Sequence, residues 1–173
     1  MGMHQFRQAL RMITRSGGGD FTGPIPQQIV EEAEELLGVR FPPSYRQFLL
    51  KLGCGDVAGA EFYGIVDDNL RQGPIPNGIW LTLDERETGK LPPTMILVGF
   101  TGMSGYYALD LSRAGANREA PVVMWQAGTP VAAACPVIAT DFGSFFLDEV
   151  SNVLGEDASD GGDDDDEEDD ESE

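Results

Sequence analysis

The sequence predicts an α+β fold, a single domain in which helices flank a mixed or antiparallel sheet. Two short segments with helical spacing of apolar residues open the domain, several short β-forming segments bounded by glycine and proline follow, and a last helical segment closes it. A chain of 173 residues suits one domain with extensions, because a body of about 150 residues buries roughly 70% of its extended-chain surface. We therefore expect one hydrophobic core.

The two opening segments have clear helix signals. The first is expected from Pro26 to Gly38, because proline suits the first turn of a helix and glycine the residue after its last turn. Its glutamates lie opposite an apolar stripe, which consists of Ile29, Ala33, Leu36 and Leu37. The second follows Phe41-Pro42-Pro43 and ends at Gly53, and its apolar positions are Tyr45, Phe48, Leu49 and Leu52. Both helices are expected to pack on the same core.

The middle of the chain has the composition of short strands. Strands are expected at 61–66, 95–100, 106–111 and 121–126, and the glycine-containing turn at 101–105 predicts that the second and third form a hairpin. The apolar segment 131–138 contains Pro136, which favours an edge strand or a covered loop. Residues 79–87 fit either a strand or a helix, and Asn77 is a candidate N-cap for the helix.

A closing helix is predicted between Asp141, a candidate N-cap, and Gly155. Its apolar residues at helical spacing are Phe142, Phe145, Phe146, Val150 and Val153. The large side chains at periodic apolar positions are expected to be buried and to serve packing; they are Tyr45, Phe48, Trp125, Phe142 and Phe145.

We divide the chain into an N-terminal helix and glycine-rich linker (1–23), the domain (24–155) and an acidic tail (156–173). The N-terminal helix is amphipathic: its apolar side holds Phe6, Leu10 and Ile13, and its basic side holds Arg7, Arg11 and Arg15. It either docks on its own domain or contacts a membrane surface or a partner. The glycines at 17–19 are typical of a flexible joint.

The formal charge of -19 is unevenly distributed. The tail holds 13 of the 30 acidic residues and no basic one, so residues 1–155 keep 17 acids against 11 bases, a net charge of -6. The tail lacks aromatic and β-branched residues, and we expect it to be disordered. Two functions are open for it: solubility, or electrostatic competition for a basic surface through residues such as Asp163, Asp164, Asp165 and Asp166.

The sequence lacks the patterns of a reactive centre. Gly53 and Gly55 follow a helix and precede a strand, the reverse of a dinucleotide fingerprint. The only histidine is His4, and two cysteines, Cys54 and Cys135, cannot complete a four-ligand zinc site with it. We therefore expect no enzymatic activity, no catalytic residue, no metal and no cofactor. The cysteine usage and the lack of an apolar run of about 18 residues favour a cytoplasmic protein without membrane association.

The order of residues in the opening helices resembles the SUKH superfamily, the Smi/Knr type. The matching positions are Ile29, Ala33, Glu34, Leu37, Gly38, Phe41, Pro42, Tyr45, Phe48, Leu49, Gly53 and Gly55. The second half is similar too: 95–111 matches the strand, turn and Y-x-L-D strand of the family, 123–125 its V-x-W strand, and 141–146 its closing motif. The resemblance spans about 24–154 and favours a helix over 79–87.

The resemblance implies a non-enzymatic binding protein. Its first implication is an immunity protein that binds and neutralises a cognate bacterial toxin, often a nuclease or another nucleic-acid-modifying enzyme, without binding nucleic acid itself. The alternative is a regulatory or scaffold protein of the Smi/Knr type. An acidic inhibitor suits a toxin with a basic surface. Loops are common recognition sites, so the candidate contact residues, besides the four tail aspartates, are Asp67, Asp68, Glu85 and Glu87.

Overall fold

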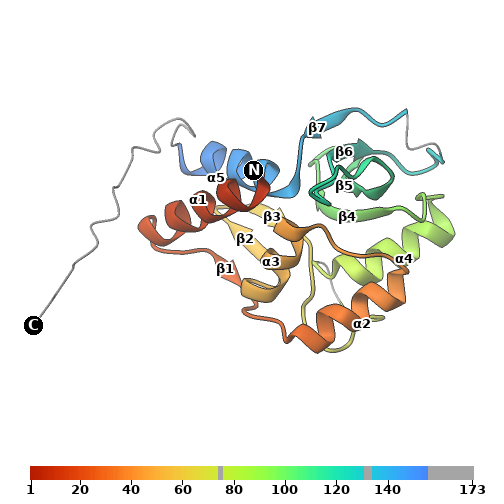
Figure 1. The fold of residues 1–173 in the computed structure, drawn as a ribbon, viewed down its shortest axis with the longest axis horizontal. Helices are drawn as coiled ribbons and strands as arrows, with labels where there is room; N and C mark the ends of the chain where they lie inside the picture. Colours follow the sequence, from red (N-terminus) through yellow and green to blue (C-terminus); the bar gives the residue numbers. More distant parts are fainter. Residues whose placement is uncertain (74–75, 131–133, 156–173) are drawn as a thin grey trace, which may run out of the picture.

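The computed structural model describes residues 1–73, 76–130 and 134–155 (Figure 1). Its elements along the chain are α1 (Gly2–Arg15), β1 (Asp20–Phe21), α2 (Gln27–Leu37), α3 (Pro43–Lys51), β2 (Gly55–Val57), β3 (Ala60–Phe62), α4 (Gly78–Thr88), β4 (Met95–Phe100), β5 (Tyr106–Asp110), the 3-10 turn η1 (Leu111–Arg113), β6 (Val122–Trp125), β7 (Val137–Ala139) and α5 (Phe142–Leu154). This element set confirms the α+β class.

The strands form two antiparallel sheets, whereas the sequence predicts one. The smaller has the order β1-β2-β3 and the larger the order β4-β5-β6-β7. Only the start of the predicted strand 61–66 is a strand, since β3 ends at Phe62. The Tyr63 amide donates to the Val98 carbonyl of β4 at 2.8 Å, but the Ile65 amide donates to the Gly53 carbonyl at 3.0 Å. The chain therefore leaves β4 after one bond, and the sheets stay separate.

The sequence pattern does not predict β1 or β2. Asp20 lies opposite Asp56 and Phe21 opposite Gly55, so the end of the expected flexible joint is a strand. The pairing depends on Gly55, because a Cβ atom there would lie 2.0 Å from the Asp20 carbonyl oxygen. Strands of two and three residues are too short to give an alternating pattern.

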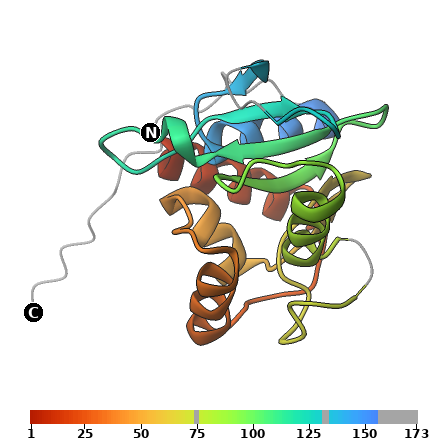
Figure 2. The same ribbon diagram turned by 90° about the vertical axis from the view of Figure 1, so that its right-hand side faces the viewer.

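The larger sheet follows the prediction closely. β4 and β5 form the expected hairpin, with a register shift between Leu97 and Gly99, and β6 pairs with β5. β7 pairs with β6 at the edge of the sheet, which confirms the edge-strand alternative for the segment after Pro136. Figure 2 shows this sheet across the top of the molecule, with α2, α3 and α4 below it.

Helix ends also agree with the sequence. The ambiguous segment 79–87 is helical, and the Asn77 Oδ1 atom accepts bonds from the Ile79 and Trp80 amides at 3.2 and 3.1 Å. Asp141 caps α5 by accepting the Ser144 amide at 2.7 Å. The buried face of α2 is rotated slightly from the predicted apolar stripe. Its buried residues are Val30, Ala33 and Leu37, while Ile29 and Leu36 are half-buried.

Helix α1 docks on its own domain and runs beside α5 (Figure 1). The rings of Phe6 and Phe146 lie 5.5 Å apart, and the Ser151 hydroxyl is 3.8 Å from the Met12 sulfur. At the start of both helices the backbones touch closely, since a Cβ on Gly143 would lie 1.8 Å from the Gly2 carbonyl oxygen. The two helices are therefore parallel, and α1 belongs to the core.

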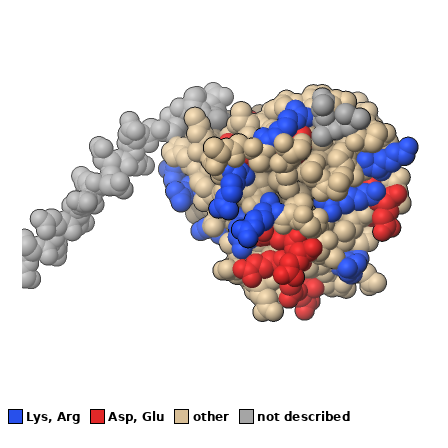
Figure 3. All heavy atoms as spheres, turned by 45° about the vertical axis from the view of Figure 1, so that its right-hand side comes forward, with Lys and Arg blue, Asp and Glu red and all other residues tan. Residues whose placement is uncertain are grey.

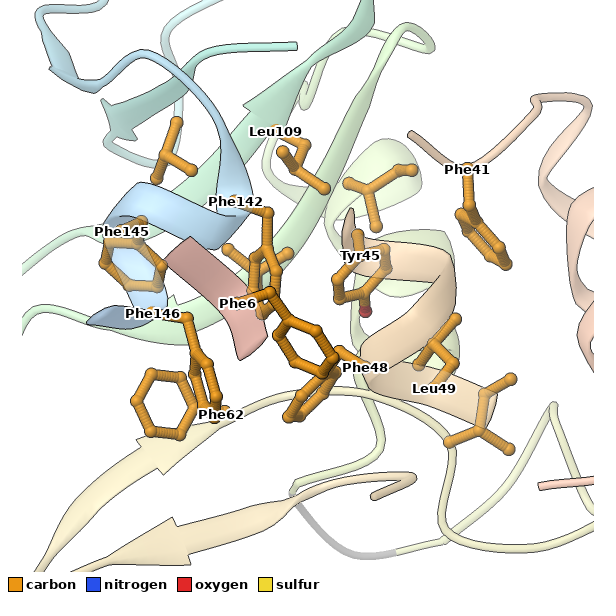
Figure 4. Close-up of a cluster of buried hydrophobic side chains, with 14 of the residues drawn as sticks. Phe6, Phe41, Tyr45, Phe48, Leu49, Phe62, Leu109, Phe142, Phe145 and Phe146 are labelled. Carbon is orange, nitrogen blue, oxygen red and sulfur yellow. The ribbon is translucent and has the colours of Figure 1, made fainter. Parts of the chain in front are cut away.

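Buried side chains form two clusters where the sequence predicts one core. The larger contains rings from α1, α3, β3 and α5, which gather at one point in Figure 4. The smaller lies between α4 and the other face of the larger sheet and surrounds Trp125. Alternate residues of β4 point to opposite faces, so Ile96 joins the first cluster and Leu97 the second. All five expected core rings are buried: Tyr45, Phe48, Trp125, Phe142 and Phe145.

No helix in the three described ranges has the length and apolar character needed to cross a bilayer.

The core assignment predicts a large loss of stability when a central ring is removed. We expect Phe48→Ala and Phe145→Ala each to lower the free energy of unfolding by about 3 to 5 kcal/mol, because a cavity remains where the ring packed. Urea denaturation measures the change, and Met103→Ala is the control because that side chain is 87% exposed. Unfolding curves that coincide with the wild type for both phenylalanine variants would contradict the packing described above.

Candidate partner-binding site

The four acids predicted from the sequence lie in two separate places. Asp67 and Asp68 are exposed in the loop after β3, where the Asp67 Oδ1 atom accepts the Asn69 amide at 2.8 Å. Glu85 and Glu87 are in the last turns of α4, half-buried and exposed respectively. Within the described ranges, no hydrogen bond or ion pair joins the two pairs.

Their electrostatic neighbours differ as well. Burial raises the pKa of the Cys54 thiol, and Asp67 contributes a smaller rise. Burial also raises the pKa of the Tyr106 hydroxyl, to which Glu85 adds. Asp67 thus lies near Cys54, and Glu85 lies near Tyr106 of the larger sheet. Asp163, Asp164, Asp165 and Asp166 lie outside the described residues.

One surface groove lies between α1, α2, α3 and the loop before β6; we call it the helical groove. It has a volume of about 910 Å³, and its charged lining consists of Glu31, Glu34, Glu35, Arg40, Arg46 and Arg118. Arg46 forms ion pairs with Glu34 and, at 3.8 Å, with Glu31. Figure 3 shows acidic and basic side chains side by side on the molecule. Charges of both signs thus line this groove and partly neutralise each other.

A second groove, the hairpin groove, lies between the β2–β3 turn, the β4–β5 turn and α5. Its volume is about 420 Å³, and its lining consists of Ala58, Gly59, Ala60, Glu61, Phe100, Thr101, Gly102, Tyr107, Phe145, Glu149 and Val153. The rings of Tyr107 and Phe145 lie 4.9 Å apart in its lining. Phe100 and Val153 remain 44% and 37% exposed beside them. The groove therefore presents apolar and aromatic surface to solvent.

The charges in the hairpin groove are all negative. Two acidic residues, Glu61 from β3 and Glu149 from α5, line the groove without an ion-pair partner among the described residues, and no basic residue lines it. Because Phe62 packs on α5, the neighbouring Glu61 side chain lies on the opposite face of β3, away from Glu149. Burial raises the pKa of Glu149, and the neighbouring Asp148 adds to the rise. Burial likewise raises the pKa of the Tyr107 hydroxyl, with a further rise from Glu149. The Glu149 carboxylate thus lies close to the Tyr107 hydroxyl and has no counter-charge among the described residues.

The wall of the groove contains a strained turn. Ala58 and Gly59, between β2 and β3, both have positive φ, 49° and 89°, the pattern of a type I′ turn, in which asparagine and glycine are favoured. An alanine in the left-handed region costs about 1 kcal/mol. The turn is held by the Asp56 side chain, which accepts the Gly59 amide at 3.1 Å. This strain is local to the groove.

A third acid, Glu119, is buried and has a structural explanation. Its two carboxylate oxygens accept the backbone amide and the hydroxyl of Ser44, both at 2.9 Å. The Ser44 hydroxyl in turn accepts the Gly143 amide at 3.1 Å. Burial raises the pKa of Glu119, while the bonds from Ser44 lower it. This acid joins the loop before β6 to the first turns of α3 and α5.

The sequence does not single out the hairpin-groove residues for partner contact. They include Glu61, Phe100, Tyr107 and Glu149. They come from β3, the end of β4, β5 and α5, so no local spacing connects them. Among the described residues, no three His, Cys, Asp or Glu side chains are grouped so as to hold a metal ion.

The fold, two antiparallel sheets with the helix pair α2 and α3 and a closing helix, is that of an α+β domain. The chain belongs to the SUKH family, because a family model described as SMI1-KNR4 cell-wall matches residues 27–146. The match runs from the start of α2 to the second turn of α5, so it includes Tyr107 and Phe145 of the hairpin groove but not Glu149. No curated protein matches the chain.

The raised pKa of Glu149 predicts a stability difference that depends on pH. A folded-state pKa above the unfolded value means that the folded protein binds the proton more tightly, so stability falls as pH rises from the ordinary carboxyl pKa of about 4.3 through the raised one. We expect Glu149→Gln to be more stable than the wild type at pH 7, and the two to converge below about pH 4. Thermal unfolding at both pH values measures this. A difference of equal size at both would indicate a packing effect instead.

Proposed function

We propose that this protein is a non-enzymatic, cytoplasmic binding protein that neutralises a cognate bacterial toxin with a basic surface. The observation that carries the proposal is the hairpin groove, in which the Glu149 carboxylate, without an ion-pair partner among the described residues, borders exposed aromatic surface. Membership of the SUKH family supports it, because the resemblance implies toxin immunity. The net charge of -19 supports a basic partner.

A protein partner accounts for both properties of the groove. Exposed aromatic side chains such as Phe100 are typical of the centre of protein interfaces, where aromatic residues are enriched. A basic partner would supply the counter-charges for Glu61 and Glu149 and would be attracted from a distance by the acidic surface. Nucleic acid fits less well, because its phosphates would be repelled by the same carboxylates.

A second function is a regulatory or scaffold role of the Smi/Knr type, in which the tail acts as a linear interaction motif. The observation that favours it is the description of the matching family model, which names SMI1-KNR4 cell-wall proteins. A large toxin gene beside the gene of this protein would favour immunity, whereas signalling partners would favour the regulatory role.

The proposal predicts a stoichiometric complex and no turnover. The purified protein should bind the toxin domain encoded beside it and abolish the activity of that toxin at equimolar concentration. Charge reversal at Asp67, Asp68, Glu85 and Glu87 should slow association about tenfold at low salt, because steering by exposed charges acts on the on-rate. Calorimetry and a toxin activity assay measure the complex, and stopped-flow binding at low salt measures the association rate. Turnover of any substrate that disappears on changing one polar residue, with folding intact, would overturn the non-enzymatic assignment.

The tail is expected to accelerate association without deciding specificity. Thirteen carboxylates on residues 156–173 extend the reach of the acidic surface, and exposed charges are screened beyond about 10 Å at 0.1 M salt. Ending the chain at Gly155 should therefore leave the melting temperature nearly unchanged, slow binding to the toxin at low salt and leave the dissociation rate almost unaltered. Stopped-flow binding across a salt series measures this. A large rise in the dissociation rate would mean that the tail contacts the toxin directly.

A further inference from the structure

We propose that the acidic tail (156–173) binds the exposed face of α1 within the same molecule. This inference goes beyond the proposed function, because it concerns a contact that forms without a partner protein. It starts from three arginines of α1, Arg7, Arg11 and Arg15, which we call the basic stripe. They repeat every four residues, so they lie along one side of the helix over about 12 Å.

The basic stripe points away from the core. The buried residues of α1 include Phe6, Ala9 and Ile13, and a step of about 100° per residue places the three arginines on the opposite side of the helix. All three are exposed, and among the described residues none of them forms an ion pair. Like charges four residues apart also repel each other along a helix. The basic stripe is therefore an accessible surface that would gain from an anionic occupant.

The chain leaves α5 beside the end of α1. The two helices are parallel, and the Ser151 hydroxyl of α5 lies 3.8 Å from the sulfur of Met12, three residues before Arg15. Gly155, the C-cap of α5, is four residues beyond Ser151. At 1.5 Å per residue, Arg15 and Gly155 lie within about 6 Å of that contact along axes about 8 to 10 Å apart. Figure 1 shows both helices ending on the same side of the molecule. The chain therefore enters the tail close to the basic stripe.

The tail has the length and the charge that suit the basic stripe. Its longest acidic run is 163–171, nine acids in succession, and seven residues (156–162) separate this run from Gly155. Seven residues span up to about 23 Å, enough to pass halfway round a helix whose diameter with side chains is about 10 to 12 Å. The acidic run can therefore lie along the stripe. Three arginines engage only a few of the 13 tail acids, so most of the tail charge still attracts a basic partner.

Two other anionic occupants fit the basic stripe less well. A membrane surface would need the apolar side of α1 to enter the lipid, but Phe6 and its apolar neighbours are packed in the core. Nucleic acid would have to approach a chain of net charge -19 and displace an anion that is tethered nearby. A short tether gives an effective concentration in about the millimolar range. The tail therefore shields the stripe from other polyanions.

The test uses the full chain and does not require the toxin. A nitroxide spin label is attached through Ser172→Cys, just after the acidic run, since the native thiols of Cys54 and Cys135 are buried. Wild-type protein treated with the same reagent corrects for any label on those thiols. The label broadens the NMR amide signals of residues that it approaches, and the chemically reduced label gives the reference. We expect broadening centred on α1 at low salt, and its loss at 1 M salt, where the screening length is about 3 Å.

A matched pair of variants tests the role of the arginines. In the labelled protein, Arg11→Gln/Arg15→Gln should reduce the broadening of α1 about threefold or more, because two of the three positive charges of the stripe are lost. Arg71→Gln/Lys90→Gln removes the same charge from exposed positions outside α1 and should leave the broadening unchanged. Thermal unfolding checks that each variant is folded.

Several results would overturn the contact. Broadening that is absent, spread evenly over the surface, centred on another element, or unchanged by Arg11→Gln/Arg15→Gln rules out binding to the basic stripe. An equimolar mixture of spin-labelled and isotope-labelled molecules tests for exchange between copies, and equally strong broadening of α1 there assigns the tail to a second copy instead. Because no toxin is present, each of these outcomes leaves the proposed function to be decided by its own experiment.

Discussion

The ring of Phe48 is the contact that joins α3, α5 and the smaller sheet. Its centroid lies within 6.3 Å of five other rings, which belong to Phe21, Tyr45, Phe62, Phe142 and Phe146. These rings come from β1, α3, β3 and α5, so one packed group fixes elements that are up to 125 residues apart in the sequence. Phe145 continues the group to Tyr107, and the hairpin groove therefore borders the core directly.

Hydrogen bonds between Ser44 and the buried Glu119 carboxylate hold the same helices that the aromatic rings pack together. A buried carboxylate is expensive unless its oxygens accept hydrogen bonds, and Ser44 supplies two to Glu119. Because the hydroxyl of Ser44 also accepts the Gly143 amide, the same residues satisfy backbone donors at the first turns of α3 and α5, which have no partner within their own helices. Packing of rings sets the distance between these helices, and this network sets where they begin.

The helices could be predicted from the sequence because their signals are local. Tyr45 and Phe48 have helical spacing, and Asn77 and Asp141 occupy caps that their side chains complete. The separation of the sheets could not be predicted, since it depends on the bond from Ile65 to Gly53, a pairing between distant backbone groups. The hairpin groove escapes prediction for the same reason: its residues come from four elements, whereas the predicted contact acids follow only from their place in the chain.

The two grooves differ in how they relate to stability, and this difference favours the hairpin groove as the binding site. In the helical groove, Arg46 compensates glutamates of α2, as expected of a surface that stabilises its own helices. In the hairpin groove, Glu149 is desolvated without a cation, Ala58 holds a left-handed conformation, and Phe100 is exposed. The first two features oppose the stability of the free protein, the third leaves apolar surface in water, and departures of this kind concentrate where function requires them. A partner that brings a cation and covers the rings would remove two of the three costs, so part of its affinity would come from relieving them.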